Sequence, residues 1–280
     1  MRGRRSLKPV RTRSYHLGRV KILLPLIFIL CVVILSFSHF NILNTNDTNY
    51  TTVKVLIYSG SDTNYNCIYQ TEKCLDESNL KNYVPGIKFT YNTSNIINEE
   101  TLSGYDVVIM PGSENGFSYV NDENIDVDDL KSYVASGKGF VGICAGAYSG
   151  AEYTDSWYYG WGLAPNVNNV PYLETGNVTI DLTSQGSDII SFTNDMISHV
   201  NGPAMYTTSN QAVVFATYSN PNSSYNGYAA IVGDYYGEGR TVLSGVHPEL
   251  TPQNAEMMVD LIIWAYNGTY ENNTTTNVTS

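Results

Sequence analysis

Basic residues are scarce over most of this 280-residue sequence. After the first 21 residues only seven Lys and Arg side chains remain, against 26 Asp and Glu, so residues 22–280 carry a net charge of −19. Such an acidic chain repels polyanions, and nucleic acid is therefore not an expected partner. The sequence is nevertheless 42% hydrophobic, which is enough for a packed core and excludes a wholly disordered protein.

The sequence also lacks the usual signatures of cofactor sites. No His, Cys, Asp and Glu residues have the spacing of a metal-ligand set, and the glycines in 112–116 are not followed by the Lys-Ser/Thr of a phosphate-binding loop. We therefore expect no cofactor and no metal. Cys67 and Cys74 are predicted to form a disulfide in an oxidising compartment, unless one straight helix holds them about 10.5 Å apart. Both alternatives stay open.

The first 43 residues differ in composition from the rest. Residues 1–21 hold eight basic residues and no acid, and residues 22–43 are mostly apolar and long enough to cross about 30 Å of hydrocarbon. A cleaved signal peptide is the alternative, but no Ala-x-Ala-like site follows the apolar run. We expect a cytoplasmic tail at 1–21 and a transmembrane anchor at 22–43, with the following residues outside the cell.

The rest of the chain is predicted to form one domain with polar flanks. Residues 44–51 are expected to be a linker, 52–266 the globular domain and 267–280 a polar tail. The sequence contains nine Asn-x-Ser/Thr sequons, most of them in the two flanks. This distribution agrees with export.

Short apolar runs indicate the fold class. They occur at residues 53–58, 107–110, 139–143, 212–218, 228–232 and 241–244. Because these runs are nearly continuous, they favour strands that are covered on both faces. Helices are predicted over 126–135 and 252–266. Strands that alternate with helices predict an α/β fold with a mostly parallel sheet, and ligands bind at the carboxyl ends of such strands.

The segment Gly142-Ile-Cys-Ala-Gly146 follows one of these predicted strands. It has the Gly-x-nucleophile-x-Gly pattern, with Cys144 in the place of a serine. The glycines permit a sharp turn, and the N-terminus of a following helix would favour the Cys144 thiolate. The N–H of Ala145 would then donate to an oxyanion. The alternative is an ordinary turn with a buried cysteine.

Two of the four histidines, His199 and His247, lie in the predicted domain. His247 comes just after the predicted strand 241–244, and we therefore expect it at the same sheet edge as Cys144. Glu249, two residues further on, would hold the imidazole in one tautomer. These residues predict a Cys-His-Glu triad. His199 is predicted to be structural or to position the substrate, and the aromatic cluster at 157–161 is interpreted either as a lid over a ligand or as packing over the domain.

Together these motifs resemble the class I glutamine-amidotransferase-like superfamily, and within it the N-terminal domain of eukaryotic biotin-protein ligases and its stand-alone relatives. The resemblance covers most of residues 53–250 and is carried by the segments 55–60, 107–113, 138–148, 201–206, 215–218 and 237–249. It implies a flavodoxin-like three-layer sandwich with a mostly parallel sheet. It also implies a catalytic triad of Cys144, His247 and Glu249.

The resemblance further implies that the loop after the third strand supplies an oxyanion donor, from Gly112 or Ser113. Relatives usually have Pro-Gly-Gly in this loop, and serine tolerates a positive φ less readily than glycine, which puts the geometry of the donor in question. We expect Tyr148, Glu114 and Asn201 to contact the substrate. A ligase catalytic domain has no counterpart in the sequence, and biotin ligation is therefore not expected.

The sequence thus predicts a membrane-anchored cysteine hydrolase that faces outward and acts on a small-molecule or peptide amide. The alternative is a catalytically inactive binding or scaffold module with the same fold.

Overall fold

The computed structural model describes residues 50–192 and 196–266. The predicted basic tail, the apolar segment 22–43 and the polar tail 267–280 lie outside these residues. Within the described ranges, no helix combines the length and the hydrophobicity needed to span a bilayer.

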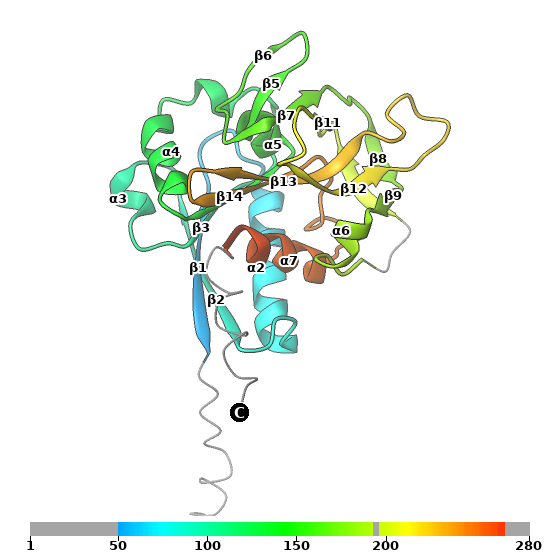
Figure 1. Cartoon of the computed structure of the whole chain (residues 1–280). Coiled ribbons are helices and arrows are strands. Elements are labelled where there is room, and N and C mark those ends of the chain that lie inside the picture. The colour runs from blue at the N-terminus through cyan, green and yellow to red at the C-terminus, as the bar shows by residue number, and fades with distance from the viewer. Residues whose placement is uncertain (1–49, 193–195, 267–280) are drawn as a thin grey trace, which may run out of the picture. The chain divides into compact units, whose positions relative to one another are not determined.

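Five parallel strands form the centre of the main sheet (Figure 1). Their order across the sheet is β2 (Ile87–Ser94), β1 (Thr51–Tyr58), β3 (Val107–Met110), β4 (Gly139–Ile143) and β14 (Gly239–Ser244). All four neighbouring pairs are parallel. This is the strand order of flavodoxin-like proteins, and it confirms the predicted α/β fold with a mostly parallel central sheet.

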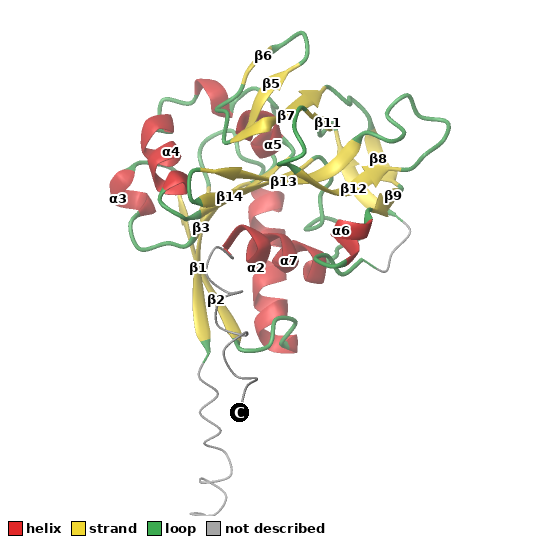
Figure 2. Cartoon of the chain, in the orientation of Figure 1, coloured by secondary structure: helices red, strands yellow, loops and turns green. Residues whose placement is uncertain are grey.

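Helices cover both faces of these strands (Figure 2). On β1, Val55 and Ile57 belong to a hydrophobic cluster with residues of α2 (Tyr65–Lys81) and α7 (Ala255–Tyr266). Leu56 and Tyr58 belong to a second cluster with residues of α4 (Val127–Ala135) and α5 (Ala145–Gly150). Successive strand residues point to opposite faces, and both faces are largely buried, so the predicted strand runs are nearly continuous in apolar residues.

The sheet continues beyond β14 with further strands, and most of these are antiparallel to their neighbours. β13 (Ala229–Tyr236) pairs with β14, and beyond it follow β11 (Ala204–Thr207), β7 (Ala164–Val170), β5 (Ala151–Thr154) and β6 (Tyr158–Tyr159). β12 (Val213–Tyr218) pairs with β13 and with β9 (Ile180–Leu182). A separate antiparallel ribbon contains β8 (Thr175–Val178) and β10 (Ile197–Val200). The remaining short elements are α3 (Glu99–Leu102), α6 (Ser184–Ser187) and the 3₁₀ turn η1 (Tyr119–Asn121).

The helix ends follow from local capping. The Asp126 side chain accepts from two backbone N–H groups at the start of α4, as the sequence predicts. α7 begins at Ala255, three residues later than predicted, because the side chain of Asn254 accepts from the N–H of Met257.

Helix α2 was not predicted from the sequence. This helix carries both Cys67 and Cys74, and their thiols are free, which excludes the disulfide alternative.

Asp260 of α7 predicts a pH dependence of stability. Burial raises the pKa of this carboxyl to about 6, although it accepts a hydrogen bond from the Ser191 N–H at 2.8 Å. Between about pH 4, the usual Asp value, and about pH 6, the folded chain therefore binds more protons than the unfolded chain. The free energy of unfolding should fall as the pH rises through this window.

We expect this fall to be smaller in Asp260→Asn than in the wild type. Denaturant unfolding of both proteins across the pH window measures it, and identical slopes in the two proteins would contradict the assignment.

Candidate active site

Cys144 lies at the end of β4 in a backbone conformation that is rare for a residue with a side chain. Its φ is 54° and its ψ is −104°, and such strain costs about 1–3 kcal/mol. The flanking glycines are required by close approach. A Cβ on Gly142 would lie 2.4 Å from the carbonyl oxygen of Gly146, and one on Gly146 would lie 2.0 Å from that of Met110. The elbow predicted from the sequence is therefore present, and Cys144 is 6% exposed.

His247 and Glu249 form a buried pair in the segment that follows β14. The Nδ1 of His247 lies 2.7 Å from the Oε1 of Glu249, and the two side chains are 2% and 0% exposed. The backbone N–H of His247 donates to the carbonyl of Ser198 on β10 at 2.8 Å. This bond fixes the segment against the β8–β10 ribbon, whose Val200 carbonyl accepts from the Cys144 thiol at 3.3 Å.

Nearby charge and burial shift the pKa of His247 in opposite directions. Burial alone would lower the pKa of its imidazole, but the Glu249 carboxylate and the thiols of Cys144 and Cys67 raise that pKa well above its ordinary value. Both thiols lie against the same imidazole. We conclude that the Glu249 carboxylate and the two neighbouring sulfur atoms outweigh burial in their effect on the pKa of this imidazole.

Cys67 is the residue that the sequence analysis missed, because it was weighed only as a disulfide partner. It lies in the first turn of α2, which begins after the capping residue Asn64. Its Sγ, a ring nitrogen of His247 and a carboxylate oxygen of Glu249 lie within 4.8 Å of one another. Sequence spacing could not indicate this cluster, because its donors are far apart in the sequence and meet only in the fold. The sequence gives no clear signal for Cys67, because α2 was not among the predicted helices.

The imidazole of His247 packs closely against Gly112. A Cβ at this position would lie 2.9 Å from Cε1 of His247 and 3.0 Å from Sγ of Cys67. The space that a side chain would fill is therefore taken by the two site residues. Glycine is required here for close packing.

Three backbone N–H groups at the site have no acceptor within the described residues. They belong to Ala145, Gly112 and Ser113, the predicted oxyanion donors, and their role stays a prediction. The concern about serine in this loop is wrong, because Ser113 does not have a positive φ. Its hydroxyl instead donates to the carbonyl of Asp62 at 2.7 Å and fixes the loop.

A cavity of about 430 Å³ opens beside Cys144. Seven of the nine residues proposed from the sequence line it: Gly112, Ser113, Glu114, Cys144, Tyr148, Asn201 and His247. Ala145 and Glu249 are buried behind this lining. The aromatic side chains of Phe117 and Trp157 add an apolar wall, with ring centroids 4.5 Å apart.

The three predicted substrate contacts differ in their freedom to bind. The Tyr148 hydroxyl is already engaged, since it donates to the Asn201 carbonyl at 3.1 Å and accepts from the Tyr172 N–H. Glu114 is exposed and accepts from the Asn64 side chain. Asn201 is exposed and has a φ of 53°. Of these side chains, Glu114 and Asn201 are therefore the better placed to meet a ligand.

His199 has a structural position. Its Nδ1 lies 2.9 Å from the Glu174 carbonyl and its Nε2 lies 3.1 Å from the Gly202 carbonyl. Both ring nitrogens are thus occupied by backbone groups, and burial lowers the pKa of the imidazole. His199 ties together two segments that border the cavity.

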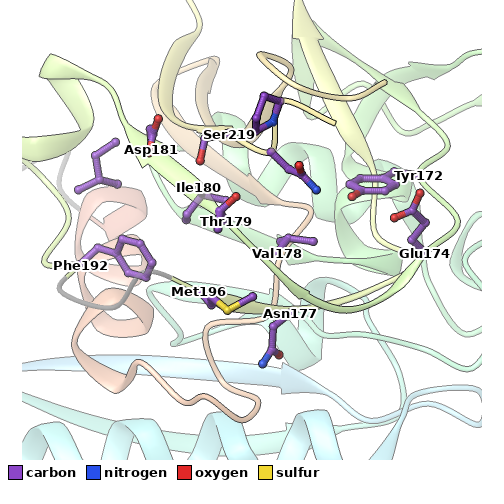
Figure 3. Close-up of a pocket in the computed structure, with 13 residues that line it drawn as sticks. Tyr172, Glu174, Asn177, Val178, Thr179, Ile180, Asp181, Phe192, Met196 and Ser219 are labelled. Carbon is purple, nitrogen blue, oxygen red and sulfur yellow. The ribbon is translucent and has the colours of Figure 1, made fainter. Parts of the chain in front are cut away.

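A second and larger cavity, of about 1140 Å³, lies beside β8 and β9 (Figure 3). In that view Phe192 and Tyr172 lie at opposite ends of the lining, with Asp181 and Glu174 as its carboxylates. As far as the structure describes this lining, it contains neither cysteine nor histidine. The chemistry available for covalent catalysis is therefore in the smaller cavity.

Comparison with known proteins supports one family for the first half of the domain. Residues 53–157 match the family model described as "Biotin-protein ligase, N terminal". The matched region includes Cys144 and ends before His247 and Glu249. No match was found among the curated proteins.

Two solved structures share the fold. A putative ThuA-like protein from Bacteroides uniformis is 14% identical, with a TM-score of 0.53 over 79% of this chain and 94% of that chain. A β-galactosidase from a Rahnella species is 15% identical, with a TM-score of 0.50, and the match covers 75% of this chain and 30% of the enzyme. At these identities the likeness shows the fold alone.

The contact between Gly112 and His247 predicts the effect of a single methyl group. Gly112→Ala should displace the imidazole or Cys67, because both lie within 3.0 Å of the new Cβ. We expect alkylation of Cys144 at neutral pH to slow by about tenfold, since small displacements at reacting groups have effects of this size or larger. Peptide-resolved mass spectrometry measures the rate.

Gly116→Ala is the matched control in the same loop. Its new Cβ would meet Tyr148 at 3.4 Å, which is an ordinary contact, and the rate should stay at the wild-type value. Equal rates in both variants and the wild type would contradict the proposed role of Gly112.

Proposed function

We propose that this protein is a cysteine-dependent amide hydrolase of the glutamine-amidotransferase-like type, with Cys144 as nucleophile, His247 as acid and base, and Glu249 as the residue that orients His247. One observation carries the proposal: the strained Cys144 shares a small cavity with His247, which is held by the buried carboxylate of Glu249. A nucleophile, a base and an orienting group in this order are the parts that covalent hydrolysis requires.

The first half of the reaction forms a thioester. The protonated His247 lies against Cys144 and favours the thiolate, which attacks the carbonyl carbon of the amide. The N–H groups of Ala145 and of Gly112 or Ser113 donate to the oxyanion that forms. The imidazolium gives its proton to the departing amine as the carbon–nitrogen bond breaks.

The second half returns the site to its starting state. Water attacks the thioester carbon, and neutral His247 takes a proton from it. The carbon–sulfur bond breaks, the carboxylic acid product leaves and the thiolate–imidazolium pair is restored. Glu249 stabilises the imidazolium whenever it is present, at a distance of 2.7 Å.

The location proposed for the domain favours one substrate class. We place the chain in a membrane through residues 22–43, with the domain outside the cell. Free glutamine is a poor substrate there, whereas a peptide or a cell-envelope amide fits the location. The net charge of −19 over residues 22–280 disfavours nucleic acid as a partner.

Thiol reactivity tests the pairing of Cys144 with His247. In the full-length protein, we expect rapid alkylation of Cys144 near neutral pH and a reduction of about tenfold or more in His247→Ala, because the thiolate loses its cation. Mass spectrometry separates Cys144 from the other cysteines. Equal and slow rates in both proteins would favour a binding module without turnover.

A substrate screen tests the reaction itself. Envelope peptides and glutamine analogues are incubated with the full-length protein, and product is measured together with the mass of an acylated Cys144 peptide. Cys144→Ala should abolish both signals. Cys74→Ala, which removes a buried cysteine outside the cavity, should keep both. Hydrolysis that survives in Cys144→Ala would refute the assignment of the nucleophile.

A further inference from the structure

A buried cluster at the cavity adds one residue, Cys67, to the His247 and Glu249 of the proposed hydrolysis. It contains Cys67, His247 and Glu249, whose donor atoms lie within 4.8 Å of one another and whose side chains are all buried. Cys67 comes from α2, and the other two residues come from the segment after β14. Thiolate, imidazole and carboxylate are the side-chain donors that Zn²⁺ takes from proteins.

The geometry is close to that of a bound ion. With bonds of about 2.0–2.3 Å, the donor atoms of a tetrahedral zinc site lie about 3.3–3.8 Å apart. The longest distances in the cluster therefore need to shorten by at most about 1.5 Å, and the 2.7 Å contact between Nδ1 of His247 and Oε1 of Glu249 needs to open by about 0.6 Å if both atoms bind the ion. A side chain at position 112 would obstruct this rearrangement, since its Cβ would press on both Cys67 and His247.

Two atoms of the cluster also have unused hydrogen-bonding capacity. Glu249 Oε2 and His247 Nε2 are buried and have no hydrogen-bond partner within the described residues. Buried polar atoms are nearly always paired, and an unpaired one requires an explanation, such as a catalytic role or an ion that it would bind. Both unpaired atoms belong to side chains whose exposure is 2% or less.

The charges balance as well. A Zn²⁺ ion with one thiolate, one carboxylate and a neutral imidazole forms a complex without net charge, so its burial is not opposed by an uncompensated ion. Binding releases the proton of the Cys67 thiol and the extra proton of His247.

We infer that Cys67, His247 and Glu249 form a binding site for Zn²⁺. The inference goes beyond the proposed hydrolysis and does not depend on it. Zn²⁺ binding and hydrolysis exclude each other, however, because a bound ion would occupy His247, the proposed base, and Glu249, the residue that orients it. Zinc would therefore inhibit any reaction that Cys144 performs with His247.

The test uses the full-length protein, first treated with a chelator and a thiol reductant. Zn²⁺ is titrated calorimetrically, and Co²⁺ is used as a spectroscopic probe of the same site. We expect one ion per chain, a thiolate-to-Co²⁺ charge-transfer band and the strong visible absorption of tetrahedral Co²⁺. Cys144→Ala should keep the charge-transfer band, which assigns it to Cys67 and separates this test from that of hydrolysis.

Variants on one helix provide the matched comparison. Cys67→Ala should abolish the band and weaken Zn²⁺ binding by about tenfold or more. Cys74→Ala should change neither, because Cys74 is buried on the same helix but does not belong to the cluster. Glu249→Gln should weaken Zn²⁺ binding and keep the band.

Two outcomes would overturn the inference. One is the absence of a charge-transfer band in the wild type and in Cys144→Ala, which requires no folded Cys67 variant. The other is a Zn²⁺ affinity that Cys67→Ala and Glu249→Gln leave unchanged, with circular dichroism showing that both variants are folded.

Discussion

The burial of one carboxylate constrains the whole carboxyl edge of the sheet. Glu249 has no exposed surface, and a charge in such surroundings requires a partner at short range. His247 is that partner, and Glu249 in turn raises the pKa of its imidazole. Two contacts hold His247 in place. Its backbone N–H donates to the Ser198 carbonyl, and its ring packs closely against Gly112, which has no side chain. Neighbouring groups are thus fixed by the needs of a single ionised side chain.

The parallel sheet is what gathers the other residues around this pair. Cys144 follows β4, His247 follows β14, Gly112 follows β3, and Cys67 lies in the helix after β1. In a flavodoxin-like sheet the carboxyl ends of these strands lie along one edge, so residues that are far apart in the sequence become neighbours. The site is therefore a product of topology, and local sequence supplies only the residue types.

The limits of the sequence analysis follow from the same fact. The strands at 53–58, 107–110, 139–143 and 241–244 were predictable because they are buried on both faces, and Cys144 and His247 were predictable because each directly follows such a strand. Cys67 carries no comparable signal, since its helix begins with the mixed polar and aromatic residues Tyr65-Asn-Cys-Ile-Tyr69. The four-residue strand β10 is too short for a period to be recognised, yet it positions His247.

The β8–β10 ribbon forms a two-stranded sheet of its own, and an isolated bridge joins its Ser198 to His247. The Val200 carbonyl of the ribbon accepts a hydrogen bond from the Cys144 thiol, and its Ser198 carbonyl accepts one from the backbone N–H of His247. The framework that bears the cysteine and the accessory piece that restrains it are thus separate architectural units.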